Sequence, residues 1–383
     1  MQLLALSVDN LRNIEAIRLE AHSRLNIFLG DNGQGKTNLL EAIHLTAALR
    51  PLKPLVRSGE LIRFGEKQAR VLGDYDVDGP LPITVTIESK GRKATLAGKQ
   101  VRDVGQVASR IGVVAFTPED LSVIRAGPDR RRRALDRFSY SIDASFAVFA
   151  RRYEKALEQR NRLLKQTRVD AVLLESFTEP LVEAGVALLR ERIRVVRAWA
   201  PRFQAASRLI SDEHLEPTLA YSSSLLTEKE MKMHDDAKMN DSPDDLDPSI
   251  LAERFLEKLH SQREGERMRR TTLTGPHLDD LVVAMHARRA RHLASQGEAR
   301  ALVLALKIAE VQLATEARGT APLVLLDDVA GELDPKKSLC LFQVLNEVDA
   351  QIFVTATHRG VLPKNLGESA QHRLENGCIE KNA

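Results

Sequence analysis

The stretch GDNGQGKT, residues 30 to 37, carries residue types that can hold a chain of phosphates. Gly30, Gly35, Lys36 and Thr37 fit the pattern G-x-x-x-x-G-K-[ST], in which backbone N–H groups surround the phosphates. The lysine of such a loop reaches the terminal phosphates, and the hydroxyl that follows it binds Mg²⁺. We therefore predict an ATP-binding loop formed by Gly30, Asp31, Asn32, Gly33, Gln34, Gly35, Lys36 and Thr37, with Lys36 also acting in catalysis and Thr37 as a metal ligand.

A second candidate group ends the apolar run PLVLLDD, almost three hundred residues later. Asp327 follows the predicted strand directly, where a carboxylate can complete the shell of a metal ion, and we assign it to Mg²⁺. Asp328 is then placed to orient or deprotonate an attacking water, as a catalytic base. Paired acids after a strand can also be a helix cap or a solvated turn, and that alternative stays open here.

A third group lies in ASQGEARALVLALKIAE, residues 294 to 310, at the start of an amphipathic helix. Ser295, Gln296 and Gly297 would offer a hydroxyl and free N–H groups to phosphate oxygens. The same residues also suit an ordinary helix cap. His358, at the end of the predicted strand QIFVTATH, is a further candidate ATP contact whose role the sequence leaves open.

The elements that must position these residues change character along the chain. Strand-rich segments such as LNIFLG and PITVTIES fill residues 1–128 and place the phosphate loop between a buried strand and a helix. Residues 129–274 form a helical lobe with a short coiled-coil-like arm, in which apolar residues recur at spacings of three and four. An acidic stretch at 222–249 interrupts this lobe. Residues 275–383 return to α/β texture, so we predict a nucleotide-binding α/β head split by a helical insertion.

Composition narrows the function classes. The 383 residues carry 56 lysines and arginines against 53 acidic residues, so a nucleic-acid partner must be inferred from local clusters of charge. Two cysteines are too few for a disulfide framework or a zinc cluster, and no apolar run approaches the roughly 18 residues of a membrane span. We expect a cytoplasmic, nucleoid-associated protein with no membrane contact.

One strongly basic cluster lies at the predicted root of the arm. Residues Arg130, Arg131, Arg132 and Arg133 stand together in PDRRRRALDR. Clustered arginines neutralise phosphates and make DNA binding sensitive to salt. Aromatic residues are scarce, so contact with a duplex backbone is favoured over stacking on single-stranded bases. A solvated face or an anchor for the arm is the alternative reading of these arginines.

The order of the segments resembles that of the ABC-type ATPases, including the SMC group. Within them the chain most resembles the RecF family, through GDNGQGKTNLLEAI, SGELIRFG, VVAFTPEDL, GPDRRRRALD, TLTGPHLDDL, SQGEARALVLALKIAE and LLDDVAGELD. The resemblance implies an ABC-type head in which the serine–glycine segment completes the ATP site of a second subunit. It also implies an ATP-dependent homodimer that is a monomer without ATP, slow hydrolysis, duplex DNA at single-strand gaps, and a pathway shared with RecR, RecO and RecA.

Two features depart from the family's usual pattern. Glu298 stands where a second glutamine is usual, and a carboxylate facing ATP would be repelled unless it points away. Residues Thr117 to Asp120 replace the glutamine loop of ABC transporters and have no assigned role. The alternatives that remain are a structural SMC-like protein, which would need a far longer arm, and a transporter ATPase, which would need that glutamine loop.

Overall fold

The computed structural model describes residues 1–53, 56–210, 215–227, 230–231, 247–328, 333–364 and 366–380. They form two compact units, one made of Met1–Leu121, Leu209–Ser211 and Val303–Ala383, the other of Ser122–Arg208 and Asp212–Leu302. The first unit holds the predicted phosphate loop and acid-ended strand, and the second holds the helical lobe. Most of the acidic stretch at 222–249 lies outside the described residues.

A central parallel sheet organises the first unit. Its strand order is β15-β14-β3-β13-β12-β8, and every pairing except the β14–β15 hairpin is parallel. The strands are β3 (Leu25–Leu29), β8 (Val113–Phe116), β12 (Leu323–Leu326), β13 (Ile352–Ala356), β14 (Ser369–Glu375) and β15 (Cys378–Ile379). β12 and β13 are buried along their whole length, as expected for parallel strands covered on both faces.

A second, antiparallel sheet completes this unit, in the order β2-β1-β4-β5-β6-β7. Its strands are β1 (Gln2–Leu11), β2 (Ile14–Glu20), β4 (Gln68–Asp76), β5 (Pro80–Glu88), β6 (Gly91–Leu96) and β7 (Lys99–Gln100). β4 and β5 bury alternate residues, so one face of this sheet meets the core and the other meets solvent.

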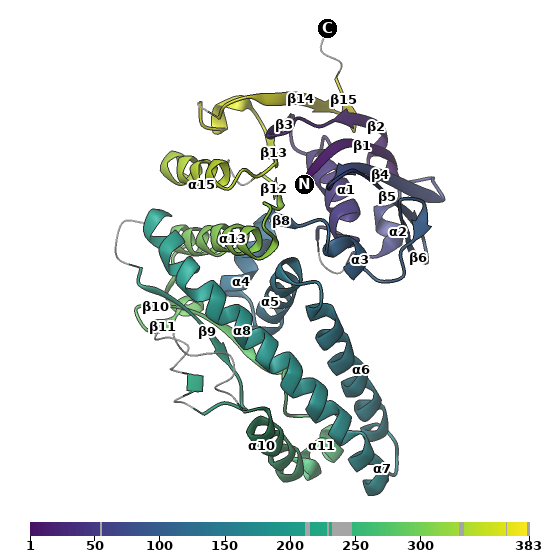
Figure 1. The fold of residues 1–383 in the computed structure, drawn as a ribbon, viewed down its shortest axis with the longest axis vertical. Coiled ribbons are helices and arrows are strands. Elements are labelled where there is room, and N and C mark those ends of the chain that lie inside the picture. The colour runs from purple at the N-terminus through teal and green to yellow at the C-terminus, as the bar shows by residue number, and fades with distance from the viewer. Residues whose placement is uncertain are drawn as a thin grey trace. The chain divides into compact units, whose positions relative to one another are not determined.

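Helix α1 (Lys36–Ala48) joins the two sheets into one core. Its apolar residues, such as Leu39 and Ile43, lie in the same buried cluster as Leu6 of β1 and Phe353 of β13. Figure 1 shows α1 beside β1, β4 and β5. Ten of its residues are buried, among them the charged Lys36 and Glu41.

The remaining helical segments of this unit are short except for α15. They are α2 (Ser58–Leu61), α3 (Gly105–Ala108), the 3₁₀ turns η1 (Pro118–Leu121) and η3 (Arg359–Val361), and α15 (Pro335–Glu347). The Asp334 side chain caps α15 by accepting from the Lys337 N–H, and Pro335 occupies the first turn where its missing N–H costs nothing.

The second unit is mainly helical. Its helices are α4 (Ser122–Arg125), α5 (Pro128–Ile142), α6 (Phe146–Leu164), α7 (Ala171–Ser176), α8 (Thr178–Ile210), α10 (Pro248–Ser261), α11 (Arg263–Arg269) and α12 (Ala290–Leu293). The predicted apolar stripe of α8 is confirmed, because Val182, Leu189, Ile193 and Phe203 are all buried. Figure 1 shows α6 and α8 running side by side, and Gly185 of α8 gives room there for Tyr153 of α6.

A three-stranded sheet of β9 (Pro217–Ser222), β10 (Asp280–Met285) and β11 (Arg288–Arg289) belongs to this second unit. The expected second half of the head, residues 275–383, includes the strand segment LVVAM. β10 instead pairs with β9, Val283 lying opposite Leu219, so the second unit extends to Leu302. A short apolar strand does not specify which sheet it will join.

Helix α13 (Gln296–Arg318) begins in the second unit and ends in the first. Among the described residues, no helix is both long enough and apolar enough to cross a membrane.

Candidate nucleotide site

The phosphate loop links the end of β3 to the start of α1, as predicted. Gly35 has a φ of 104°, and a Cβ there would lie 2.9 Å from the Asn13 side-chain oxygen. A side chain at this position would be strained both by the backbone and by the neighbour. The glycine of the motif is therefore required by the way the loop packs on Asn13.

Lys36 is buried against its own loop. Its ammonium group donates to the backbone oxygens of Gly30 (2.5 Å) and Asp31 (2.9 Å). Burial lowers the pKa of Lys36, while the nearby carboxylates of Asp328, Asp327 and Asp31 favour its charged form. The loop thus holds a buried cation against its own backbone oxygens, beside three carboxylates.

Side chains from outside the motif hold the loop in place. The Asn13 amide donates to the Gly33 oxygen (3.2 Å) and accepts from the Asn38 side chain (2.8 Å). On the other side, the backbone oxygen and side-chain oxygen of Gln34 accept from the Gly377 and Asn376 N–H groups, at 3.0 and 2.6 Å. The turn of the β14–β15 hairpin is therefore fastened to the phosphate loop.

The acid-ended strand meets the loop at Thr37. The Thr37 hydroxyl donates to Asp327 Oδ1 at 2.7 Å across 290 residues of sequence. Asp327 is 4% exposed, and burial raises its pKa despite hydrogen bonds from Thr37 and Thr355. A hydroxyl and a buried carboxylate are hard oxygen donors of the kind that Mg²⁺ prefers, so the residues present fit this metal.

Asp328 adopts a left-handed backbone conformation, with a φ of 54°. Its N–H donates to the Thr355 hydroxyl at 2.8 Å, and the same hydroxyl lies 3.1 Å from Asp327 Oδ1. Thr355 therefore links the two acids. Sequence reasoning missed Thr355 and Asn13, because a single polar residue in a strand or turn matches no motif by spacing.

The neighbouring strand end brings a further acid. β8 pairs with β12 so that Phe116 faces Leu326, and the Asp327 N–H donates to the Phe116 oxygen at 3.0 Å. Just beyond Phe116, Glu119 lies 3.1 Å from the Lys53 ammonium, and both charges act on Asp327. The segment Thr117 to Asp120 thus lies beside the acids, and Asp120 anchors it by accepting from the Thr117 N–H.

His358 follows the end of β13 and is exposed. Among the described residues, no hydrogen bond ties its side chain to Lys36 or to the two acids. Its assignment as an ATP contact stays a prediction.

Ser295, Gln296 and Gly297 lie at the start of α13 in the second unit, and all three are exposed. The Ser295 N–H donates to Glu298 Oε2 at 2.7 Å, and the Glu298 N–H donates to the Ser295 hydroxyl at 3.3 Å. This reciprocal pair is a capping box, and it lowers the pKa of Glu298. Glu298 therefore turns back onto the helix end, where hydrogen bonds with Ser295 stabilise its ionised carboxylate.

The four arginines of the basic cluster divide into different environments. Arg131 is 3% exposed and donates to both oxygens of Asp280, at 2.7 and 2.9 Å. Arg132 donates to the Asp279 backbone oxygen at 2.5 Å. Arg130 and Arg133 are exposed, although Arg133 pairs with Asp129 at 2.8 Å. The Arg131 guanidinium is therefore used inside the unit, and the assignment of the four arginines to DNA binding stays a prediction.

The acids of TGPHLDDL have structural partners. Tyr221 donates to Asp279 at 2.9 Å, and Tyr153 lies 2.6 Å from the His277 ring. Within the described part of the chain, no group of three or more His, Cys, Asp or Glu side chains could hold a metal ion. The buried network joins α6, β9 and the segment before β10.

Comparisons with known proteins place this chain in a family. The family model described as RecF/RecN/SMC N terminal domain matches residues 2–378. The DNA replication and repair protein RecF of Anaeromyxobacter sp. (strain K) is 40% identical, with 99% of each chain covered. The chain belongs to the RecF family. RecF of Myxococcus xanthus (strain DK1622) is 38% identical, over 93% of this chain and 91% of its own.

Solved structures agree with this family. A RecF–ATP structure, named as a recombination mediator in the RecFOR pathway, matches with a TM-score of 0.87 and 27% identity, covering 100% of this chain and 98% of its own. An SMC head bound to the C-terminal winged-helix domain of ScpA matches with a TM-score of 0.54 and 13% identity, which shows the shared fold alone. This RecF-family chain is a DNA replication and repair protein with an ABC-type ATPase head.

Proposed function

We propose that this chain is an ATP-switched recombination mediator, whose nucleotide site is formed by the phosphate loop and the acid-ended strand. The observation that carries this proposal is the 2.7 Å hydrogen bond from Thr37 to Asp327, which joins two distant motifs at one point. ATP binding by a RecF structure of the same fold supports it.

Within this site each residue has a distinct task. Lys36 would exchange the backbone oxygens of Gly30 and Asp31 for phosphate oxygens. Thr37 and Asp327 would hold Mg²⁺, which when bound neutralises charge on the phosphates. Asp328 would accept the proton of the attacking water, at the end of the strand that positions it.

The second unit would complete the ATP site of another copy of the chain. Ser295, Gln296 and Gly297 are exposed at the start of α13, and the capping box leaves the Ser295 hydroxyl hydrogen available to a phosphate oxygen. ATP would then hold two chains together as a homodimer that separates without it, and His358 would approach the terminal phosphate. Hydrolysis would reset the dimer.

The RecFOR pathway named for a similar structure supports RecO and RecR as partners. From the family resemblance we also infer that the dimer would bind duplex DNA beside single-strand gaps in the cytoplasm and act in one pathway with RecA. Exposed Arg130 and Arg133 are the members of the cluster most accessible to the duplex backbone, whereas Arg131 is buried.

Mixing two inactive variants tests the shared site. Lys36→Met damages the phosphate loop and Ser295→Arg damages the exposed helix start, so each pure variant loses both shared sites. A mixture keeps one intact site per mixed pair, and light scattering with ATP should detect recovered dimer. If the mixture stays monomeric although the Ser295→Arg chain binds ATP, the site is not shared between subunits.

A further inference from the structure

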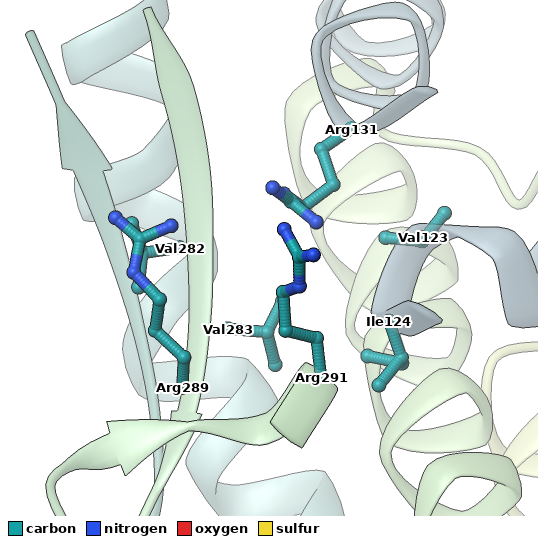
Figure 2. A pocket seen from close by; sticks show the side chains of 7 residues that line it. All are labelled: Val123, Ile124, Arg131, Val282, Val283, Arg289 and Arg291. Atoms are coloured by element: carbon teal, nitrogen blue, oxygen red, sulfur yellow. The ribbon is translucent and has the colours of Figure 1, made fainter. Parts of the chain in front are cut away.

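A small pocket in the second unit gathers three arginines. Arg131 comes from α5, Arg289 from β11 and Arg291 from α12, while Val123, Ile124 and Val283 supply apolar lining. Figure 2 shows the Arg291 guanidinium pointing toward that of Arg131. The pocket volume is about 10 Å³, which is the room of about one water molecule.

One carboxylate pairs with two of these three cations. Asp280 is 7% exposed, and its two oxygens accept from Arg131 at 2.7 and 2.9 Å and from Arg289 at 2.9 Å. Arg131 also donates to the Ala126 backbone oxygen at 2.5 Å. Among the described residues, Arg291 has no hydrogen-bond or ion-pair partner. The pocket therefore carries an excess of positive charge.

The roles of the arginines differ. Arg131 is 3% exposed and donates through three nitrogen atoms, so its guanidinium is a fixed positive charge at the bottom of the pocket. The Arg289 side chain is 47% exposed and contacts Asp280 through one nitrogen, and Arg291 is exposed, so both can still donate. Guanidinium groups match the geometry of phosphate oxygens, and an anion between facing cations removes their repulsion.

We propose that Arg289 and Arg291 bind a phosphate group, one oxygen of which enters the pocket above Arg131. The pocket is too small for a whole phosphate, so the remaining oxygens stay outside, where a diester or a free phosphate can equally be accommodated. The apolar lining limits competition from water for that one oxygen. Two sources share this chemistry: the backbone of a nucleic acid, and free inorganic phosphate.

A phosphate bound in this pocket would also affect the start of α13. α12 ends at Leu293, two residues before Ser295, so a phosphate on Arg291 would fix the segment that leads into the exposed start of α13. This consequence rests on the proposed function, in which Ser295 contacts ATP. Phosphate binding itself does not, and it can be measured on the protein without nucleotide.

Thermal unfolding in inorganic phosphate, compared with chloride at the same ionic strength, tests the free-phosphate source. We expect phosphate to raise the Tm of wild type above its value in chloride, and Arg291→Gln to weaken apparent phosphate binding at least about tenfold, as for a lost charge-assisted hydrogen bond. Arg288→Gln is the matched control, because Arg288 is the exposed neighbour on β11 and does not line the pocket.

A salt titration of duplex DNA binding tests the other source. If the occupant is a backbone phosphate, Arg291→Gln should lower the slope of log K against log salt by about 0.9, and Arg288→Gln should leave the slope unchanged. If Arg291→Gln weakens only the binding of inorganic phosphate, the occupant is the free anion. If it lowers the salt slope of duplex binding, the occupant is a phosphate of the nucleic acid. If Arg291→Gln matches wild type in both titrations, or the control loses as much, the proposal is overturned.

Discussion

The Thr355 hydroxyl lies 3.1 Å from Asp327 Oδ1, between the two acids of the candidate site. It accepts from the Asp328 N–H at 2.8 Å, so one side chain from β13 orients both residues that follow β12. Thr355 is 1% exposed, and water cannot replace its hydroxyl easily. It is a positioning residue, because it acts on the nucleotide through Asp327 and Asp328.

Thr355→Val keeps the shape of the side chain and removes the hydroxyl. The Asp328 N–H then loses its acceptor and Asp327 loses one orienting contact. We therefore expect the Mg²⁺ concentration that gives half-maximal nucleotide binding to rise about tenfold. Titrating Mg²⁺ at a fixed concentration of a fluorescent ATP analogue measures this directly. Thr355→Ser should retain most of the affinity, and equal Mg²⁺ dependence in the valine variant would remove Thr355 from this role.

Asp328→Asn separates the chemistry of the second acid from its backbone conformation. Asparagine tolerates the left-handed φ of 54° and cannot accept the proton, so ATP binding should persist while hydrolysis falls by roughly 10²–10⁴-fold. Asp328→Ala should lose hydrolysis and also stability, because alanine is strained at this φ. An Asp328→Asn protein that hydrolyses ATP at the wild-type rate would contradict the base assignment.

The ion pair of Arg160 and Glu266 tests the packing of the helical unit. The two side chains lie 2.7 Å apart and are 2% and 0% exposed, and Arg160 also donates to Thr272 and Thr178. Glu266→Gln leaves the arginine charge buried without its partner, which we expect to cost about 3–5 kcal/mol of unfolding free energy.

Fluorescence of the single tryptophan measures this cost, because Trp199 is buried in α8 beside Phe138. Glu158→Gln is the matched control. Its carboxylate pairs with Arg162 at 2.6 Å, but both side chains are more than half exposed. Surface pairs of this kind contribute little to stability. The free energy of unfolding of the control, measured in urea, should therefore lie within about 0.5 kcal/mol of the wild-type value. Equal costs for the two variants would refute a special role for burial.

Asp279 should make the stability of the helical unit depend on pH. Burial raises the pKa of its carboxyl group from 3.8 to about 6. Between pH 4 and pH 6 the Asp279 carboxyl group keeps its proton in the folded chain and loses it in the unfolded chain. The free energy of unfolding therefore falls as pH rises from about 4 to about 6.

Asp279→Asn removes this titration and can still accept the 2.9 Å hydrogen bond from Tyr221. Its stability relative to wild type should therefore increase from pH 4 to pH 6, by up to about 3 kcal/mol for a shift of this size. Urea titrations followed by Trp199 fluorescence at each pH give the comparison. Parallel pH profiles for the two proteins would show that Asp279 is not the titrating group.

The sequence identifies candidate site residues where a motif and an element boundary coincide, and their roles stay predictions. Lys36, Thr37, Asp327 and Asp328 were found because a buried strand precedes each pair of residues and fixes where their side chains emerge. Asn13 and Thr355 were missed, since each acts through one hydrogen bond to a residue far away in sequence. Such partners become visible only when the strands are placed side by side.

The helical unit was harder to predict for two different reasons. The run of arginines shows its charge in the sequence but not its partners, and Arg131 is neutralised by Asp280, 149 residues away. β10 has the composition of a head strand, and only its pairing with β9 assigns it to the other unit. The periodic stripe of α8 was predicted correctly because a long helix encodes its buried face locally.

The fastening of Gln34 to the turn at Asn376 and Gly377 has a consequence for biosynthesis. These hydrogen bonds join residues 342 and 343 positions apart, so the ribosome releases the phosphate loop long before it releases the turn that secures it. Residues 122–302, which form the helical unit, emerge between these two events. A nascent chain can therefore complete its arm while its nucleotide pocket is still open, and a chain truncated before residue 376 would fold that arm and lack a secured loop.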